Sequence, residues 1–238
     1  MLKKNTTTLS IYLAFFTSIF IFNSTLYAQD YTVKGFDVSH HQGNIQWNKI
    51  SPQQYQFVYI KATEGGDYQD PKFQENWLNA KERGFHVGAY HFYRLCSLGK
   101  DQANNFIKTV PNQVSNLPPV IDIEYDSKCI TTYTKEQLNQ EIKIIYQSLA
   151  KHYGKKPIIY TSSRFYNLFL SPTFSFAPLW IRHYQTTPPI LADQHSWFFW
   201  QHTKQGRING IDGDVDINVY AASQDIWENY LHYLEKQQ

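Results

Sequence analysis

From residue 31 onward, short apolar runs rich in β-branched residues alternate with longer segments that carry apolar residues at helical spacing. The apolar runs predict eight strands, at residues 33–38, 57–62, 85–92, 118–124, 157–160, 179–183, 197–202 and 215–219. The helical segments lie at residues 70–83, 100–109, 134–153 and 222–236, with a short one after residue 162. About five βα units followed by three strands without long helices predict an α/β fold, an irregular TIM-like β/α barrel.

Local signals fix several of these boundaries. Thr134 and Gln137 have the spacing of a capping box, which predicts the start of the long third helix, and Gly154 is its stop. Gly35 interrupts the first strand, which indicates a close approach of another chain segment. No linker, internal repeat or low-complexity segment divides the chain after residue 29, so residues 29–238 are expected to form a single domain.

Polar residues stand at the predicted strand ends. In a parallel barrel the C-terminal ends of the strands open into one mouth, so these residues are expected to share a polar cleft. Each alone is more simply explained by exposure to solvent, whereas all of them together favour a site. They are Asp37, Lys61 to Glu64, His91, Asp122 with Glu124, Tyr160, Arg182 with His183, Gln201 with His202, and Asp216.

The strand after Pro118 and Pro119 ends in two carboxylates separated by one residue. Side chains alternate along a strand, so Asp122 and Glu124 face the same way with Cα atoms about 6–7 Å apart. Two like charges at that separation raise at least one pKa, which leaves one protonated and one ionised carboxyl group. Glycoside hydrolysis requires that combination. The alternative is a charged strand end exposed to water.

Composition and the N-terminal segment limit the expected location of the protein and its expected partners. Residues 1–28 have Lys3 and Lys4 followed by an apolar run and Ala28, which predicts a secretory signal and export to the periplasm or the exterior. Its removal brings the formal net charge from +2 to 0 (2 − 2), because the segment holds no acidic residue. We therefore expect no nucleic-acid partner, and no stable membrane insertion of the mature chain. Aromatic residues make up 17%, which suits a carbohydrate cleft or simply a large core.

Cys96 and Cys129 are the two cysteines of the chain, and each follows the end of a predicted strand. If those strands are neighbours, both thiols lie on the same rim. In an exported protein this placement favours a disulfide over a metal site.

The strand-end motifs resemble those of the family 25 glycoside hydrolases, the lysozymes that cut bacterial peptidoglycan. The likeness spans about residues 33–220, and several ordered motifs at family-like spacing make it specific. Four stretches carry it: residues 35–43 (GFDVSHHQG), 61–65 (KATEG) with Tyr68 and Asp70, 87–93 (VGAYHFY) and 119–124 (PVIDIE). Shorter matches support it at residues 159–161, 179–181, 200–201 and 215–218.

The resemblance implies a flattened β/α barrel and hydrolysis of the bond from N-acetylmuramic acid to N-acetylglucosamine. By position, Glu124 would be the general acid and Asp122 its partner, with Asp37 and Asp216 as further cleft carboxylates. Two routes are open. Asp122 or another carboxylate attacks as nucleophile, or the substrate's own 2-acetamido oxygen attacks while Asp122 stabilises the positive charge.

Further residues are assigned to substrate binding. Tyr90 and Tyr160 are expected to hydrogen-bond the reacting sugar, Gln201 to line the cleft, and Trp180 to stack on a sugar. Arg182 is the candidate donor to the lactyl group of muramic acid. Glu64 is a substrate contact or a structural ion pair, with equal weight.

Two other functions use the same residues: a chitinase or N-acetylglucosaminidase with the same carboxylate pair, and a glycan-binding protein without turnover. No cofactor or metal is expected. Asp212, Asp214 and Asp216 alternate like calcium ligands, but Ile217 stands where a calcium loop needs Gly. The expected partner is the peptidoglycan glycan strand, and the expected state is a monomer.

Overall fold

The computed structural model describes residues 31–113 and 115–236. The predicted signal segment, residues 1–28, lies outside the described residues and stays a prediction. From Tyr31 onward the contacts of the chain form one compact unit. Across this described part, every helix is too short or too polar to cross a membrane.

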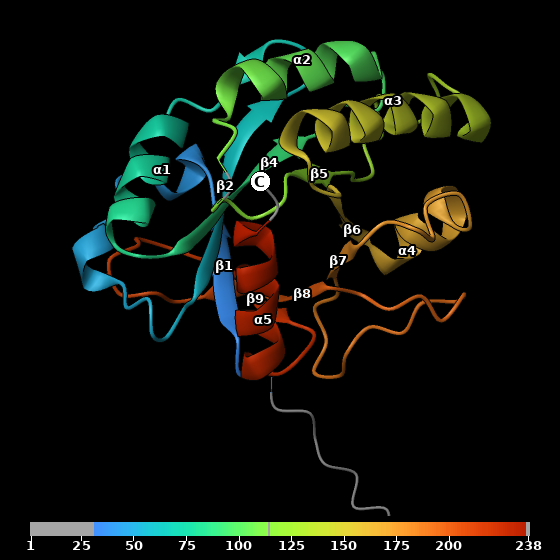
Figure 1. Ribbon diagram of the computed structural model, residues 1–238. Coiled ribbons are helices and arrows are strands. Elements are labelled where there is room, and N and C mark those ends of the chain that lie inside the picture. The colour runs from blue at the N-terminus through green and yellow to red at the C-terminus, as the bar shows by residue number, and fades with distance from the viewer. Residues whose placement is uncertain (1–30, 114, 237–238) are drawn as a thin grey trace, which may run out of the picture. The chain divides into compact units, whose positions relative to one another are not determined.

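The strands form one sheet that closes on itself (Figure 1). In the described residues it consists of β1 (Lys34–Val38), β2 (Phe57–Glu64), β3 (Tyr68–Gln69), β4 (His86–Phe92), β5 (Val120–Asp122), β6 (Ile158–Ser162), β7 (Leu179–Arg182), β8 (Phe199–Gly206) and β9 (Val215–Tyr220). The ring runs β1-β9-β8-β7-β6-β5-β4-β2 and is closed by the pairing of β1 with β2, while β3 is a short antiparallel addition to β2. The predicted TIM-like barrel is confirmed.

Helices cover the outside of the barrel after β2, β4, β5 and β6 (Figure 1). They are α1 (Phe73–Glu82), α2 (Gly99–Thr109), α3 (Lys135–Tyr153) and α4 (Ser163–Phe165), which continues into a π-helix (Tyr166–Leu170). The first strand departs from the predicted βα pattern, because two 3₁₀ turns (His40–Gln42 and Trp47–Lys49) follow it in place of a long helix. The capping box is confirmed: Gln137 N–H donates to Thr134 Oγ1 at 3.2 Å, and Gly154 ends α3 with a φ of 66°.

The direction of β9 corrects one prediction. We placed Asp216 at the C-terminal end of a parallel strand, but β9 runs antiparallel to both β8 and β1. The segment between β8 and β9 is too short for the crossover that a parallel strand needs, so the chain turns back as a hairpin. Asp216 therefore reaches the mouth from near the start of its strand, directly opposite Asp37 of β1.

Inside the ring, the inward-facing side chains are apolar at the bottom and polar at the top. Phe57, Val120 and Phe199 belong to a buried interior cluster, and Trp227 of α5 (Gln224–Glu235) joins it. Gly35 makes room for this packing, since a Cβ there would lie 2.4 Å from the ring of Phe57. The interior cluster and α5 close the bottom of the barrel, so the polar upper end is the open one.

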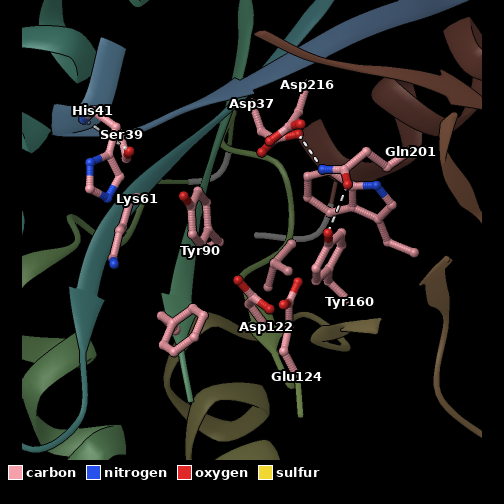
Figure 2. Close-up of a pocket in the computed structure, with 13 residues that line it drawn as sticks. Asp37, Ser39, His41, Lys61, Tyr90, Asp122, Glu124, Tyr160, Gln201 and Asp216 are labelled. Atoms are coloured by element: carbon pink, nitrogen blue, oxygen red, sulfur yellow. Dashed lines mark hydrogen bonds between the residues drawn. The ribbon is translucent and has the colours of Figure 1, made fainter. Parts of the chain in front are cut away.

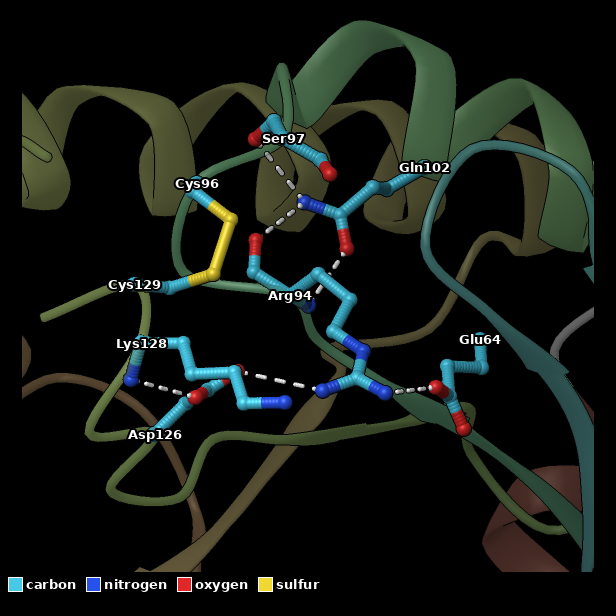
Figure 3. Close-up of a disulfide and its surroundings, with 8 residues drawn as sticks. All are labelled: Glu64, Arg94, Cys96, Ser97, Gln102, Asp126, Lys128 and Cys129. Carbon is cyan, nitrogen blue, oxygen red and sulfur yellow. Dashed lines mark hydrogen bonds and ion pairs between the residues drawn. A yellow bond between two sulfur atoms is a disulfide. The ribbon is translucent and has the colours of Figure 1, made fainter.

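The predicted disulfide is confirmed. Cys96 and Cys129 are bonded, with an S–S distance of 2.04 Å and Cα atoms 5.0 Å apart, and they join the loops after the neighbouring strands β4 and β5. Figure 3 shows a second link beside it, in which Arg94 donates to Asp126 at 3.1 Å and also contacts Glu64. Both links restrain the segment that follows Glu124.

Candidate active site

A cavity of about 200 Å³ lies at the open end of the barrel. It collects eight of the residues predicted for the site, from seven different strands and the segment after β5. Figure 2 shows Asp122 and Glu124 side by side, across the cavity from Asp37 and Asp216. The lining residues are Asp37, Ser39, His41, Lys61, Tyr90, Phe92, Val120, Asp122, Glu124, Tyr160, Trp180, Gln201 and Asp216.

Asp122 and Glu124 both line the cavity, as the alternation along the strand predicted. Ile123 between them is fully buried on the opposite side, and its N–H donates to the carbonyl oxygen of Tyr160 at 2.9 Å. The carboxyl group of Asp122 is also buried. Burial first, then the charges of Glu124 and Asp37, raise the pKa of Asp122 well above its ordinary value. The carboxylate pair thus retains a proton at a pH where a solvated carboxyl group has lost it.

One oxygen of Asp122 is left without a partner. Among the described residues, no group donates a hydrogen bond to its Oδ1, although this atom is buried. An unsatisfied buried acceptor is unfavourable, and active sites hold such groups for a donor that the substrate brings. Asp122 is therefore set up to receive a hydrogen bond from a bound ligand.

Glu124 is held by Arg182 at the end of β7. Arg182 Nη1 lies 2.9 Å from each of the two Glu124 oxygens, and both side chains are partly buried. This contact occupies Arg182, whose expected role as donor to a lactyl group stays a prediction. The contact also fixes the orientation of the Glu124 carboxyl group toward the cavity.

Asp37 and Asp216 form a second carboxylate pair across the β1–β9 ladder. Asp37 Oδ2 accepts hydrogen bonds from Asn218 Nδ2 at 2.7 Å and from Gln201 Nε2 at 3.0 Å. Burial and the neighbouring Asp216 raise the pKa of Asp37 despite these bonds. Burial and the charge of Glu124 raise the pKa of Asp216 to about 6. Four acidic groups thus share one partly desolvated cavity.

Gln201 connects the two sides of the mouth. Its Oε1 accepts hydrogen bonds from Tyr160 at 2.8 Å and from Tyr184 at 2.7 Å, while its amide nitrogen binds Asp37. Tyr184 and Asn218 are absent from the sites that the sequence predicted. The alternation rule could have found Asn218, which stands two residues after Asp216 on β9, whereas Tyr184 lies beyond the end of β7.

Trp180 and Tyr90 form the walls and floor. Trp180 is only 2% exposed, packs 5.0 Å from the ring of Tyr160 and donates to Asn218 Oδ1 at 3.0 Å. Trp180 therefore forms the floor of the cavity and does not present an exposed ring face. Tyr90 lines the cavity beside Asp37 and Asp122, whose charges add to the effect of burial in raising its pKa. Its hydroxyl group is thus a hydrogen-bond donor at all ordinary pH values.

Glu64 forms the structural ion pair that was one of its two expected roles, while the substrate contact stays a prediction. It accepts from Lys61 Nζ at 2.6 Å and contacts Arg94, which in turn binds Asp126 beyond the end of β5. These ion pairs connect the ends of β2, β4 and β5. They also neutralise Lys61, which lines the cavity and whose charge acts on Asp122.

The raised pKa of Asp216 predicts a gain in stability on its removal. Between about pH 4 and pH 6 the folded chain binds more protons at this position than the unfolded chain, so this group's contribution to stability falls as the pH rises through that window. We expect Asp216→Asn to raise the melting temperature by about 2–4 °C at pH 7, with the difference vanishing below about pH 4. Calorimetry across this pH range checks it; a lower melting temperature at pH 7 would contradict it.

A closed β/α barrel whose mouth gathers two carboxylate pairs among sugar-compatible aromatic and amide side chains defines an enzyme of the glycoside hydrolase class. The sequence matches Glycosyl hydrolases family 25 over residues 36–211. The chain belongs to this family and is a glycoside hydrolase.

Similar proteins carry names that agree with this assignment. Lysozyme M1 of Streptomyces globisporus is 33% identical, over 80% of this chain and 68% of its own length. The structure of a family 25 glycosyl hydrolase from Bacillus anthracis superposes with a TM-score of 0.79 at 38% identity, covering 84% of this chain and 94% of the other. A bacterial lysozyme structure from Streptomyces coelicolor gives 0.76 at 31% identity, covering 87% and 98%.

Proposed function

We propose that this protein is an exported muramidase, with residues 29–238 as its catalytic domain. It hydrolyses the β-1,4 bond between N-acetylmuramic acid and N-acetylglucosamine in peptidoglycan. The observation that carries the proposal is the Asp122–Glu124 pair, which faces one cavity and retains a proton through burial and mutual repulsion. The similarity to Lysozyme M1 supports a cell-wall substrate.

Glu124 delivers the proton to the leaving oxygen. It stands two residues beyond the end of β5 at the partly exposed edge of the cavity, where a glycosidic oxygen can reach it. Arg182 orients its carboxyl group. In the bound complex the proton that the pair retains lies on Glu124, and it passes from Glu124 to the leaving oxygen as the bond breaks. Asp122 then bears the negative charge, which is the state needed beside a developing positive sugar.

Asp122 acts on the substrate's 2-acetamido group. Its buried Oδ1 has no donor among the described residues, and the acetamido N–H of the bound sugar is a donor of the right kind. This contact orients the acetamido oxygen for attack at the anomeric carbon and stabilises the positive charge that develops on the ring it forms. The unpartnered oxygen therefore favours the substrate-assisted route over a covalent bond to Asp122.

The remaining site residues bind the sugar and set the electrostatic potential of the cavity. Asp37 and Asp216 supply negative potential opposite the reacting pair, and Gln201 fixes Asp37. Tyr90 and Tyr160 present hydroxyl groups at the cavity wall, and Trp180 closes the floor beneath the reacting sugar.

Comparing two polymers tests the proposal. The mature enzyme is expected to release new reducing ends from purified peptidoglycan and to cut chitin oligomers of equal length at least about tenfold more slowly, since a missing polar substrate group leaves its site unpaired. Reducing-end assays on both polymers, at equal sugar concentration, measure this. Chitin cleaved at comparable rates would replace the muramidase by the chitinase alternative, and binding without any cleavage would indicate a glycan-binding protein.

A further inference from the structure

Three cations act on the carboxylates of the cavity, and two of them are neutralised by neighbours. Arg182 is paired with Glu124 and Lys61 with Glu64. The third is Lys204 of β8, whose charge acts on Asp216. Within residues 31–113 and 115–236, Lys204 forms no ion pair. A positive charge thus stands uncompensated at the rim of an acidic cleft.

Lys204 is held in place without being neutralised. Its Nζ lies 6.0 Å from the centroid of the Tyr184 ring, at the outer range of a cation–π contact. Such a contact restrains an ammonium group but leaves its charge and its N–H donors free for an anion. Tyr184 is 39% exposed, so the pair is open to solvent and to ligands.

Tyr184 is itself fixed to the catalytic network. Its hydroxyl group donates to Gln201 Oε1 at 2.7 Å, and the preceding His183 N–H donates to the Gln201 carbonyl oxygen at 3.0 Å. Gln201 lines the cavity and binds Asp37 (Figure 2). The Tyr184–Lys204 pair therefore lies on the rim of the cleft, one hydrogen bond away from its lining.

The hairpin explains why Lys204 stands there. The register of β8 against β9 shifts between Gln201 and Thr203 and again between Thr203 and Gly206. Such irregularities re-aim side chains at barrel rims. Lys204 lies within the second of these shifts, in the exposed part of β8 beyond the buried residues 199–201.

We propose that Lys204, held by Tyr184, recognises a carboxylate on the substrate and makes the enzyme prefer acidic glycan strands to neutral ones. This inference rests on the proposed function and assigns to Lys204 the acid-recognising role that Arg182 cannot fill while it binds Glu124. The carboxylate belongs either to the lactyl group of stripped muramic acid or to the stem peptide attached to it.

Direct binding to an inactive enzyme tests the inference. In a Glu124→Gln background, calorimetry at low salt measures the Kd of three tetrasaccharides: one with stem peptides, the same one after the peptides are removed, and chitotetraose. Lys204→Gln should weaken binding of at least one acidic probe about tenfold and leave chitotetraose unchanged. Lys204→Arg should retain most of the affinity, and Lys151→Gln, an exposed lysine on α3, should change nothing.

The outcomes distinguish a lactyl carboxylate from a stem-peptide carboxylate. They also distinguish the inference about Lys204 from the proposed muramidase function. Weakening for the peptide-bearing probe alone assigns the carboxylate to the stem peptide, and weakening for the stripped probe assigns it to the lactyl group. Unchanged affinity for both acidic probes, or an equal loss for chitotetraose, would overturn the inference. Cleavage of peptidoglycan by the enzyme with Glu124 intact, assayed in parallel, tells whether the muramidase proposal stands independently of Lys204.

Discussion

Glu124→Gln is expected to lower the turnover of peptidoglycan by about 10²–10⁴-fold or more, with the fold intact. Glutamine keeps the size of the side chain and can still contact Arg182, which lies 2.9 Å from both carboxyl oxygens, but it has no proton to give to the leaving oxygen. Single-turnover release of reducing ends, together with circular dichroism of the purified variant, measures both parts of the expectation.

Glu82→Gln is the matched control for this variant. Glu82 is exposed at the end of α1, far along the chain from the acidic strand, and should give the activity of the unaltered enzyme. A folded Glu124→Gln enzyme with turnover near that of the control would remove Glu124 from the mechanism.

Asp122→Asn is expected to lower the turnover by about 10²–10³-fold while leaving stability at neutral pH equal or higher. The substitution removes the negative charge beside the reacting sugar, which is an electrostatic loss of the kind that a missing transition-state partner causes. Stability is spared because burial and neighbouring charges raise the pKa of Asp122, so its ionised form destabilises the folded chain at neutral pH.

The pH profile distinguishes catalysis from a structural role at Asp122. In the unaltered enzyme, activity should fall as the pH drops through the raised pKa of the carboxylate pair, which titrates as a unit. That acidic limb should shift or disappear in Asp122→Asn. A variant that loses melting temperature and keeps both rate and profile would show that Asp122 is structural.

Much of the barrel could be predicted from the sequence, because the spacing of apolar residues within a segment predicts whether it is a strand or a helix and which face is buried. The capping box at Thr134, the helix stop at Gly154 and the shared face of Asp122 and Glu124 are all local. The direction of β9 is not, since it depends on which strand its backbone pairs with, over 180 positions away in the case of β1. The sequence therefore placed Asp216 in the correct cleft but assigned the wrong direction to its strand.

Contacts between side chains of different strands were the least predictable part. Arg182 stands at a strand end, but only the β6–β7 and β5–β6 registers bring it to Glu124. The same holds for Glu64, whose partners come from β2 and from the loop after β4. Sequence spacing identifies which residues enter a shared cleft, and the three-dimensional register decides which of them neutralise each other and which stay free.

The identity of the sugar at the new reducing end tests the central proposal most directly. Peptidoglycan digested by the mature enzyme, reduced with borohydride and separated by mass spectrometry, should yield fragments that end in reduced N-acetylmuramic acid. Fragments that end in reduced N-acetylglucosamine would contradict the muramidase assignment.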